Sequence, residues 1–145
     1  MYQHILLPTD GSELSTRAVR AGIRLAKSLG GRVTALHTTQ EFYPSQMLTD
    51  GIIERARDYE KQTKEEAVRV LGAVEEAARE AGVACNALHR ANNRPWEEII
   101  KVATEEGCDL ISMASHGRSG VSALLLGSET AKVLTHSKIP VLVYR

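Results

Sequence analysis

The chain has 145 residues, and its 18 basic and 18 acidic residues leave no formal net charge. A neutral chain lacks the broad positive field on which non-specific nucleic-acid binding depends, so nucleic acid is excluded as an expected partner. The length predicts one domain, covering residues 1–145, with a single core of ordinary size.

Apolar runs typical of strands alternate with amphipathic stretches typical of helices from the first residues onward. In the N-terminal half we expect strands at residues 4–7 and 32–37 and helices at residues 13–29 and 51–81. The second helix would be about 45 Å long at 1.5 Å per residue, which is long for this domain size. Part of it should therefore project or bend, and Gly72 is a candidate position for a bend.

The same alternation continues through the C-terminal half. Strands are expected at residues 83–88, 109–114 and 140–144, and helices at residues 95–106 and 128–135. This order predicts an α/β fold of three layers, in which an open, parallel, five-stranded sheet has helices on both faces, as in Rossmann-like domains. In such sheets ligands bind beyond the carboxyl ends of the strands, where the strand order reverses.

A glycine-rich loop after the fourth strand is the main candidate for binding chemistry. It contains Gly117 and Gly120, and another helix opens at Gly127 and Ser128. Glycines let backbone N–H groups approach an anion closely, and the first turn of a helix adds free N–H groups and a positive dipole end. About three or four hydrogen bonds to phosphate, each contributing roughly 1.5–3 kcal/mol, suffice for micromolar binding. A simpler interpretation is that the glycines only shape a turn and Ser128 only caps a helix.

The spacing of this loop resembles the nucleotide-binding pattern of the universal stress protein family. That pattern is a glycine, two residues, a second glycine, nine residues, then Gly-Ser or Gly-Thr. The matching positions here are Ala114, Gly117, Gly127 and Ser128, so alanine replaces the first glycine. Residues 5–12, 36–38 and 139–143 also resemble the family, and the resemblance is weakest over residues 39–81.

The resemblance implies a sheet order of 3-2-1-4-5 and an ATP molecule between the ends of strands one and four. The backbone near Pro8 and Thr38 would border the adenine, Asp10 would approach the base or ribose, and the glycine-rich loop and the following helix would surround the phosphates. Magnesium would arrive with the nucleotide, and no catalytic or metal-ligating residue is assigned. The residues implied to bind the nucleotide are Pro8, Thr9, Asp10, Thr38, Met113, Ala114, Ser115, His116, Gly117, Arg118, Ser119, Gly120, Gly127, Ser128, Glu129 and Thr130.

Several individual residues have two interpretations. Asp10 is either a ribose ligand or the N-cap of the first helix, with Glu13 in capping-box spacing. Ala114 costs about 1–2 kcal/mol if its backbone needs a positive φ, and almost nothing at an ordinary strand end. Arg118 can pair with a phosphate or with an acidic neighbour. The mixed charges of residues 54–66 indicate a solvated helix face.

The resemblance implies a nucleotide-binding module of the stress response that acts as a regulator rather than as an efficient enzyme. Slow ATP hydrolysis is compatible with this role, although the chain has no GxxxxGK[ST] phosphate loop. One alternative is an interaction protein of the same fold that has lost nucleotide binding through Ala114. A less favoured alternative is an adenylating enzyme, whose Ser-Gly-Gly-x-Asp-Ser loop is replaced here by Thr-Asp-Gly-Ser at residues 9–12.

Location and assembly also follow from the sequence as expectations. The first apolar run is too short for a signal peptide, and no segment reaches the roughly 20 apolar residues that cross a bilayer. Cys85 and Cys108 belong to no paired motif, so we expect a reduced, cytoplasmic protein without membrane association. A short apolar strand at the sheet edge favours a homodimer through Val141–Tyr144, as the resemblance also implies.

Overall fold

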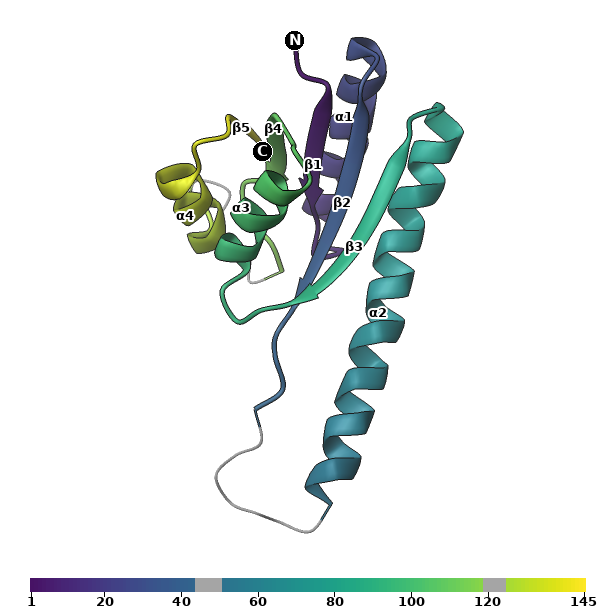
Figure 1. The fold of residues 1–145 in the computed structure, drawn as a ribbon, viewed down its shortest axis with the longest axis vertical. Coiled ribbons are helices and arrows are strands. Elements are labelled where there is room, and N and C mark those ends of the chain that lie inside the picture. The colour runs from purple at the N-terminus through teal and green to yellow at the C-terminus, as the bar shows by residue number, and fades with distance from the viewer. Residues whose placement is uncertain (44–50, 119–124) are drawn as a thin grey trace.

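The computed structural model describes residues 1–43, 51–118 and 125–145, and these form five strands and four helices (Figure 1). The strands are β1 (His4–Pro8), β2 (Arg32–Thr39), β3 (Cys85–Ala91), β4 (Leu110–Ala114) and β5 (Val141–Tyr144). The helices are α1 (Glu13–Leu29), α2 (Ile52–Ala81), α3 (Pro95–Glu105) and α4 (Ser128–His136).

The strands form one sheet in the order β3-β2-β1-β4-β5, and every neighbouring pair is parallel. The predicted α/β fold and the predicted strand order are therefore confirmed. Because β1 lies between β2 and β4, the order of the strands reverses at β1 and β4. The carboxyl ends of these two strands mark the position at which open α/β sheets bind ligands.

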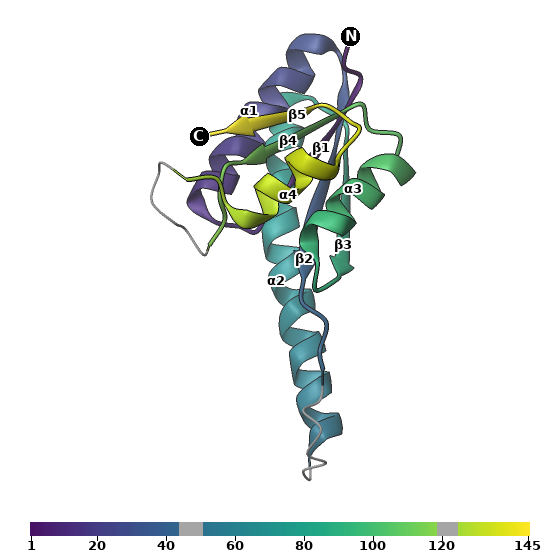
Figure 2. The ribbon, with the colours of Figure 1, turned by 90° about the vertical axis from the view of Figure 1, so that its left-hand side faces the viewer.

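Helices cover both faces of the sheet because successive residues of a strand point to opposite sides. Ile5 and Leu7 of β1 pack into one core cluster with α1 and α2, whereas Leu6 packs into a second cluster with α3 and α4. All three side chains are fully buried, and burial of such a side chain contributes about 1.5–3 kcal/mol. Figure 2 shows α3 and α4 in front of the sheet, on the face opposite α2.

The predicted boundaries of α1 agree with the structure, whereas those of the third strand were wrong. α1 starts after its N-cap Ser12 and ends at Gly30, whose φ of +67° closes the helix. Residue 83 was assigned to the third strand, but the amide of Val83 donates to the carbonyl oxygen of Ala78 and so completes the end of α2. β3 instead continues through polar residues to Ala91, because an edge strand has little need of apolar side chains.

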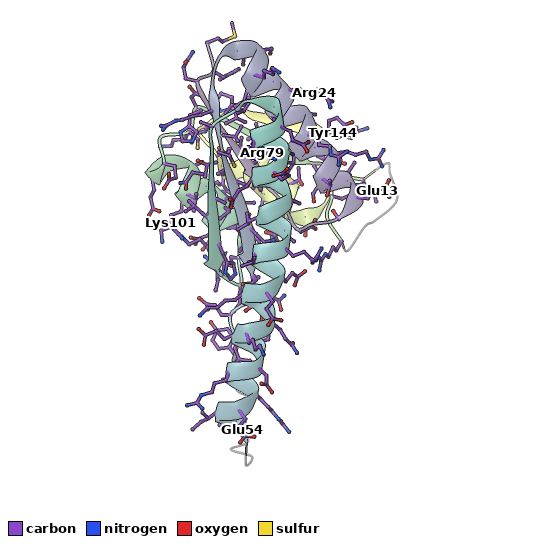
Figure 3. The ribbon with its side chains drawn as sticks, turned by 90° about the vertical axis from the view of Figure 1, so that its right-hand side faces the viewer. Glu13, Arg24, Glu54, Arg79, Lys101 and Tyr144 are labelled. Carbon is purple, nitrogen blue, oxygen red and sulfur yellow. The ribbon has the colours of Figure 1, made fainter. Side chains whose placement is uncertain are left out.

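α2 is one continuous helix of 30 residues, so it does not break at Gly72. Its buried residues all lie at or after Ala67, and the half before Ala67 runs past the ends of the strands (Figures 1 and 2). Figure 3 shows side chains standing out around this half, near Glu54. The expectation that part of the helix projects is therefore confirmed. Among the described helices, α2 included, none combines the length and apolar character needed to cross a bilayer.

Candidate functional site

The turn between β1 and α1 is held by side chains that bond to backbone groups of the turn. The hydroxyl of Thr9 lies 3.0 Å from that of Ser15 and accepts a hydrogen bond from the amide of Gly11 at 3.2 Å. Asp10 Oδ1 accepts from the amide of Ser12 at 2.9 Å. Ser12, rather than Asp10, is the N-cap of α1, and its hydroxyl accepts from the amide of Ser15. The capping interpretation of Asp10 is therefore wrong, because the helix begins two residues too late for it.

Asp10 joins this turn to the glycine-rich loop after β4. Its Oδ2 accepts a hydrogen bond from the amide of Arg118 at 2.8 Å, across 108 positions of sequence. Burial raises the pKa of the Asp10 carboxyl, but the hydrogen bonds from Ser12 and Arg118 outweigh burial and hold that pKa below its ordinary value. Asp10 therefore stays a carboxylate at neutral pH and ties the ends of β1 and β4 together.

Several groups predicted to face phosphate are occupied by protein acceptors. The amide of Ser115 donates to the carbonyl oxygen of Tyr144, and the amide of Gly127 donates to that of Ser115 at 2.7 Å. The buried hydroxyl of Thr130 donates to the carbonyl oxygen of Ala114 at 2.9 Å. Together with the Arg118 amide, these bonds correct the expectation that the whole loop offers its donors to a ligand.

Ala114 has an ordinary strand conformation. It is the last residue of β4, and no non-glycine residue in the described part of the chain has a positive φ. The left-handed strain considered from the sequence is therefore absent at this position. Gly127 has less space for a side chain, because a Cβ there would lie 3.1 Å from the Cα of His116.

The N-terminus of α4 keeps free donors. The first bond within this helix joins the amide of Ala131 to the carbonyl oxygen of Gly127 at 3.0 Å. The amides of Ser128, Glu129 and Thr130 precede it, and within the described residues they donate to no protein acceptor. Gly127 is the N-cap and offers no side-chain oxygen. The helix therefore presents the positive end of its dipole and three N–H groups that have no acceptor in the described part of the chain.

Arg118 and Glu129 each pair with a more distant element. The guanidinium of Arg118 lies 2.6 Å from Oε1 of Glu66 on α2, so Arg118 has the acidic neighbour that the sequence left as one possibility. Glu129 Oε2 accepts from the amide of Trp96 at 2.9 Å and so satisfies the first turn of α3, whose N-cap Arg94 makes no side-chain cap. The indole of Trp96 stacks on the ring of His136, which agrees with a packing role.

These segments enclose a cleft of about 750 Å³ at the carboxyl ends of the strands, a size typical of small-molecule sites. Ser115 does not line it, because Ser115 is buried beside the end of β5. Ser119 and Gly120 fall outside the described residues. The predicted residues that line the cleft are Pro8, Thr9, Asp10, Thr38, Met113, Ala114, His116, Gly117, Arg118, Gly127, Ser128, Glu129 and Thr130.

Sequence reasoning missed one wall of this cleft. Tyr59, Gln62, Thr63 and Glu66 line it from α2, inside the run interpreted as a solvated helix face. Their spacing of three and four residues places them on one side of the helix. This spacing was the sequence signal that could have identified the four residues as one face of the helix. It does not indicate whether that face points toward the ends of the strands.

His37 at the end of β2 also lines the cleft and was not predicted. Its Nδ1 lies 2.9 Å from the carbonyl oxygen of Thr9, and because a carbonyl only accepts, Nδ1 carries the proton. Nε2 is buried and has no partner among the described residues. Within those residues, no group of three or more His, Cys, Asp or Glu side chains is placed to hold a metal ion.

The chain is similar to known proteins along its full length. A family model described as the universal stress protein family matches residues 1–145. The universal stress protein MJ0577 of Methanocaldococcus jannaschii is 31% identical over 157 residues, which cover 100% of this chain and 96% of that protein. A solved structure of MJ0577 has a TM-score of 0.83 at 30% identity, covering 99% of this chain and 96% of the other.

Two further solved structures contain a nucleotide. A universal stress protein in complex with cAMP has a TM-score of 0.68 at 24% identity, covering 99% of this chain and 97% of the other. A family member from Arabidopsis thaliana with AMP bound has a TM-score of 0.69 at 18% identity, covering 98% of this chain and 90% of the other. At these identities the likeness establishes a common fold.

Proposed function

Because this chain belongs to the universal stress protein family, we propose that its cleft binds ATP, with the triphosphate at the N-terminus of α4 and the adenosine between the ends of β1 and β4. Stress response is the role associated with the family as a whole. For this chain we propose a regulatory module rather than an efficient enzyme, acting in the cytoplasm as a homodimer.

The observation that carries the proposal is the set of free amides at α4. Ser128, Glu129 and Thr130 line the cleft, and their N–H groups lack acceptors among the described residues. Hydrogen bonds to a charged group contribute about 1.5–3 kcal/mol each, so the three together supply a large share of the binding free energy that contacts to the adenosine would complete. The two neighbours solved with cAMP and with AMP give the proposal further support.

The Asp10 carboxylate is compatible with a ribose beside it. Each carboxylate oxygen has two acceptor sites, and each oxygen of Asp10 accepts one backbone hydrogen bond in the structure. One acceptor site on each oxygen therefore remains for a hydroxyl group. Thr38, at the far end of β2, lines the same cleft on the side proposed for the adenine.

The direct test removes one proposed donor while keeping the helix. Proline is tolerated at the first position of a helix, and the Gly127 backbone (φ −61°, ψ 152°) suits a following proline. Ser128→Pro deletes the amide hydrogen and should weaken ATP binding about tenfold or more, because roughly 1.4 kcal/mol corresponds to a factor of ten. Ser128→Ala keeps the amide and is the matched control for the lost hydroxyl.

Isothermal titration with ATP, with and without magnesium, measures these affinities. The unmodified protein should release or absorb heat and should gain thermal stability with nucleotide. No heat and no stabilisation at millimolar ATP would overturn the proposed function. Equal ATP affinities in the Ser128→Pro and Ser128→Ala variants would contradict the placement of the phosphates at the N-terminus of α4.

A second candidate, an interaction protein that has lost nucleotide binding, depends on Ala114. The strand conformation of Ala114 removes the backbone strain that was its physical reason. We therefore expect Ala114→Gly to change ATP affinity by less than about threefold, which corresponds to under about 0.7 kcal/mol. A sharp gain in affinity would favour the second candidate.

A further inference from the structure

The charges around the cleft oppose a polyphosphate. The described residues contribute the carboxylates of Asp10, Glu66 and Glu129 to the lining, against the single guanidinium of Arg118. The α4 amides that lack an acceptor among the described residues attract an anion, but the ionised side chains of the lining sum to a net negative charge. Each additional phosphate on a nucleotide therefore meets more repulsion.

The three carboxylates differ in what holds them. Asp10 accepts two backbone hydrogen bonds, whereas Glu129 accepts one from the amide of Trp96 and also lies 3.8 Å from the ammonium of Lys132. Glu66 contacts two cations, Arg118 at 2.6 Å and Arg69 at 3.8 Å. Its side chain is 33% exposed, so its pair with Arg118 is a surface ion pair that a stronger anion can displace.

Arg118 lies within the glycine-rich loop, directly after Gly117. Its backbone amide is fixed by Asp10, and its side chain turns toward α2 to meet Glu66. A guanidinium that is occupied by one carboxylate gives little net attraction to a phosphate, since the two partners nearly cancel in charge.

We propose that Glu66 is a selectivity residue, which disfavours highly charged nucleotides by withholding Arg118 from the phosphates and by adding its own negative charge to the cleft. The inference rests on the proposed nucleotide function and deepens it. The preferred ligands are adenine nucleotides of low charge, such as AMP, or ATP whose phosphates are neutralised by a divalent cation.

The experiment compares Glu66→Gln with Glu65→Gln. Glu65 is the neighbouring residue on α2, carries the same charge, pairs with Lys61 at the surface and is absent from the cleft lining. Dissociation constants are measured for ATP and AMP with a chelator present, and for ATP with magnesium. Circular dichroism checks that both variants are folded.

In Glu66→Gln the ratio of the ATP to the AMP dissociation constant should fall about fivefold, the effect of removing one charge at roughly 8 Å from two further phosphate charges in a water-like medium. The magnesium requirement of ATP binding should shrink as well. Glu65→Gln should leave the ratio as in the unmodified protein.

The measurements distinguish a failure of the proposed nucleotide function from a failure of the role given to Glu66. If the unmodified protein binds neither nucleotide, the proposed function and this inference fall together. If nucleotides bind but Glu66→Gln leaves the ratio unchanged, or shifts it as much as Glu65→Gln does, this inference alone is overturned.

Discussion

Gly117 gives the Asp10 carboxylate room to reach the loop after β4. Its φ is not positive, so its importance is space rather than backbone freedom. A Cβ at this position would collide with Asp10 Oδ2, the atom that accepts from the amide of Arg118. The middle glycine of the family pattern thus has a structural purpose in this chain that does not involve a ligand.

Replacing Gly117 by alanine should therefore destabilise the protein even without nucleotide. Loss of a hydrogen bond to a charged group costs about 1.5–3 kcal/mol, so Gly117→Ala should lower the free energy of unfolding by about that amount. Urea denaturation measures it. In an Asp10→Ala background the same substitution should cost much less, because the colliding carboxylate is gone. Additive costs would contradict this explanation.

His4 provides a pH-dependent contribution at the other end of the sheet. Its Nε2 lies 2.7 Å from the hydroxyl of Thr34, while its Nδ1 is buried without a partner among the described residues. Burial, with a smaller effect of Arg32, lowers the pKa of His4. The unfolded chain therefore takes up this proton at a higher pH than the folded protein does.

His4 therefore makes the folded protein less stable at low pH. Above a pH of about 6.5 both states are neutral at His4, and below it the unfolded state gains protons first, so stability falls as the pH falls. His4→Gln should reduce the difference in unfolding free energy between pH 7.5 and pH 5.5. The difference should not vanish, because burial and the nearby His37 lower the pKa of His89 in the same direction. An undiminished difference would contradict the assignment to His4.

At the scale of elements, Gly72 inside α2 and Gly82, which caps its C-terminus, should respond oppositely to alanine. A Cβ at Gly72 would meet no atom within 4 Å, and the residue lies inside a continuous helix. Gly72→Ala should raise the free energy of unfolding by about 0.5–1 kcal/mol, because alanine loses less backbone entropy. Gly82 closes the helix with a φ of +73°, so Gly82→Ala should cost about 1 kcal/mol. Denaturation curves of the two variants test both signs, and a loss of stability in Gly72→Ala would contradict the first.

Elements were more predictable from the sequence than the contacts between them. The ends of α1 follow from local signals, since Ser12 and Gly30 cap it whatever surrounds the helix. The strand order came from family resemblance and was confirmed. The Asp10 to Arg118 bond spans 108 positions, and no local pattern encodes it. The α2 wall of the cleft was missed for the same reason, because helical spacing identifies a face but not what lies opposite it.

At the scale of the whole molecule, the outer edge of β5 is the surface through which we propose that two copies pair. The carbonyl oxygens of Pro140 and Tyr144 accept from the amides of Ile111 in β4 and of Ser115 just after it, so residues 140, 142 and 144 direct their backbone groups inward. The backbone groups of Val141 and Val143 consequently face the open edge. Leu142 adds an exposed apolar side chain, 47% accessible. Such an edge is suited to pairing with a second copy.

Val143→Pro should dissociate the dimer while leaving the sheet intact, because proline deletes an outward amide and edge strands tolerate it. Val143→Ala trims the side chain but keeps that amide, and should remain dimeric. Sedimentation at tens of micromolar distinguishes the two states. A monomeric mass for the unmodified protein would contradict assembly through this edge.

The half of α2 before Ala67 forms one wall of the cleft, yet it contributes no buried side chain to the core. Its helical order rests on exposed contacts instead. The Tyr59 hydroxyl donates to the carbonyl oxygen of Gln40 at 2.6 Å, and the Glu60–Lys64 and Lys61–Glu65 pairs contribute about 0.2–0.5 kcal/mol each and weaken with ionic strength. Salt that screens these surface charges should therefore loosen this wall of the cleft while leaving the buried half of α2 unaffected.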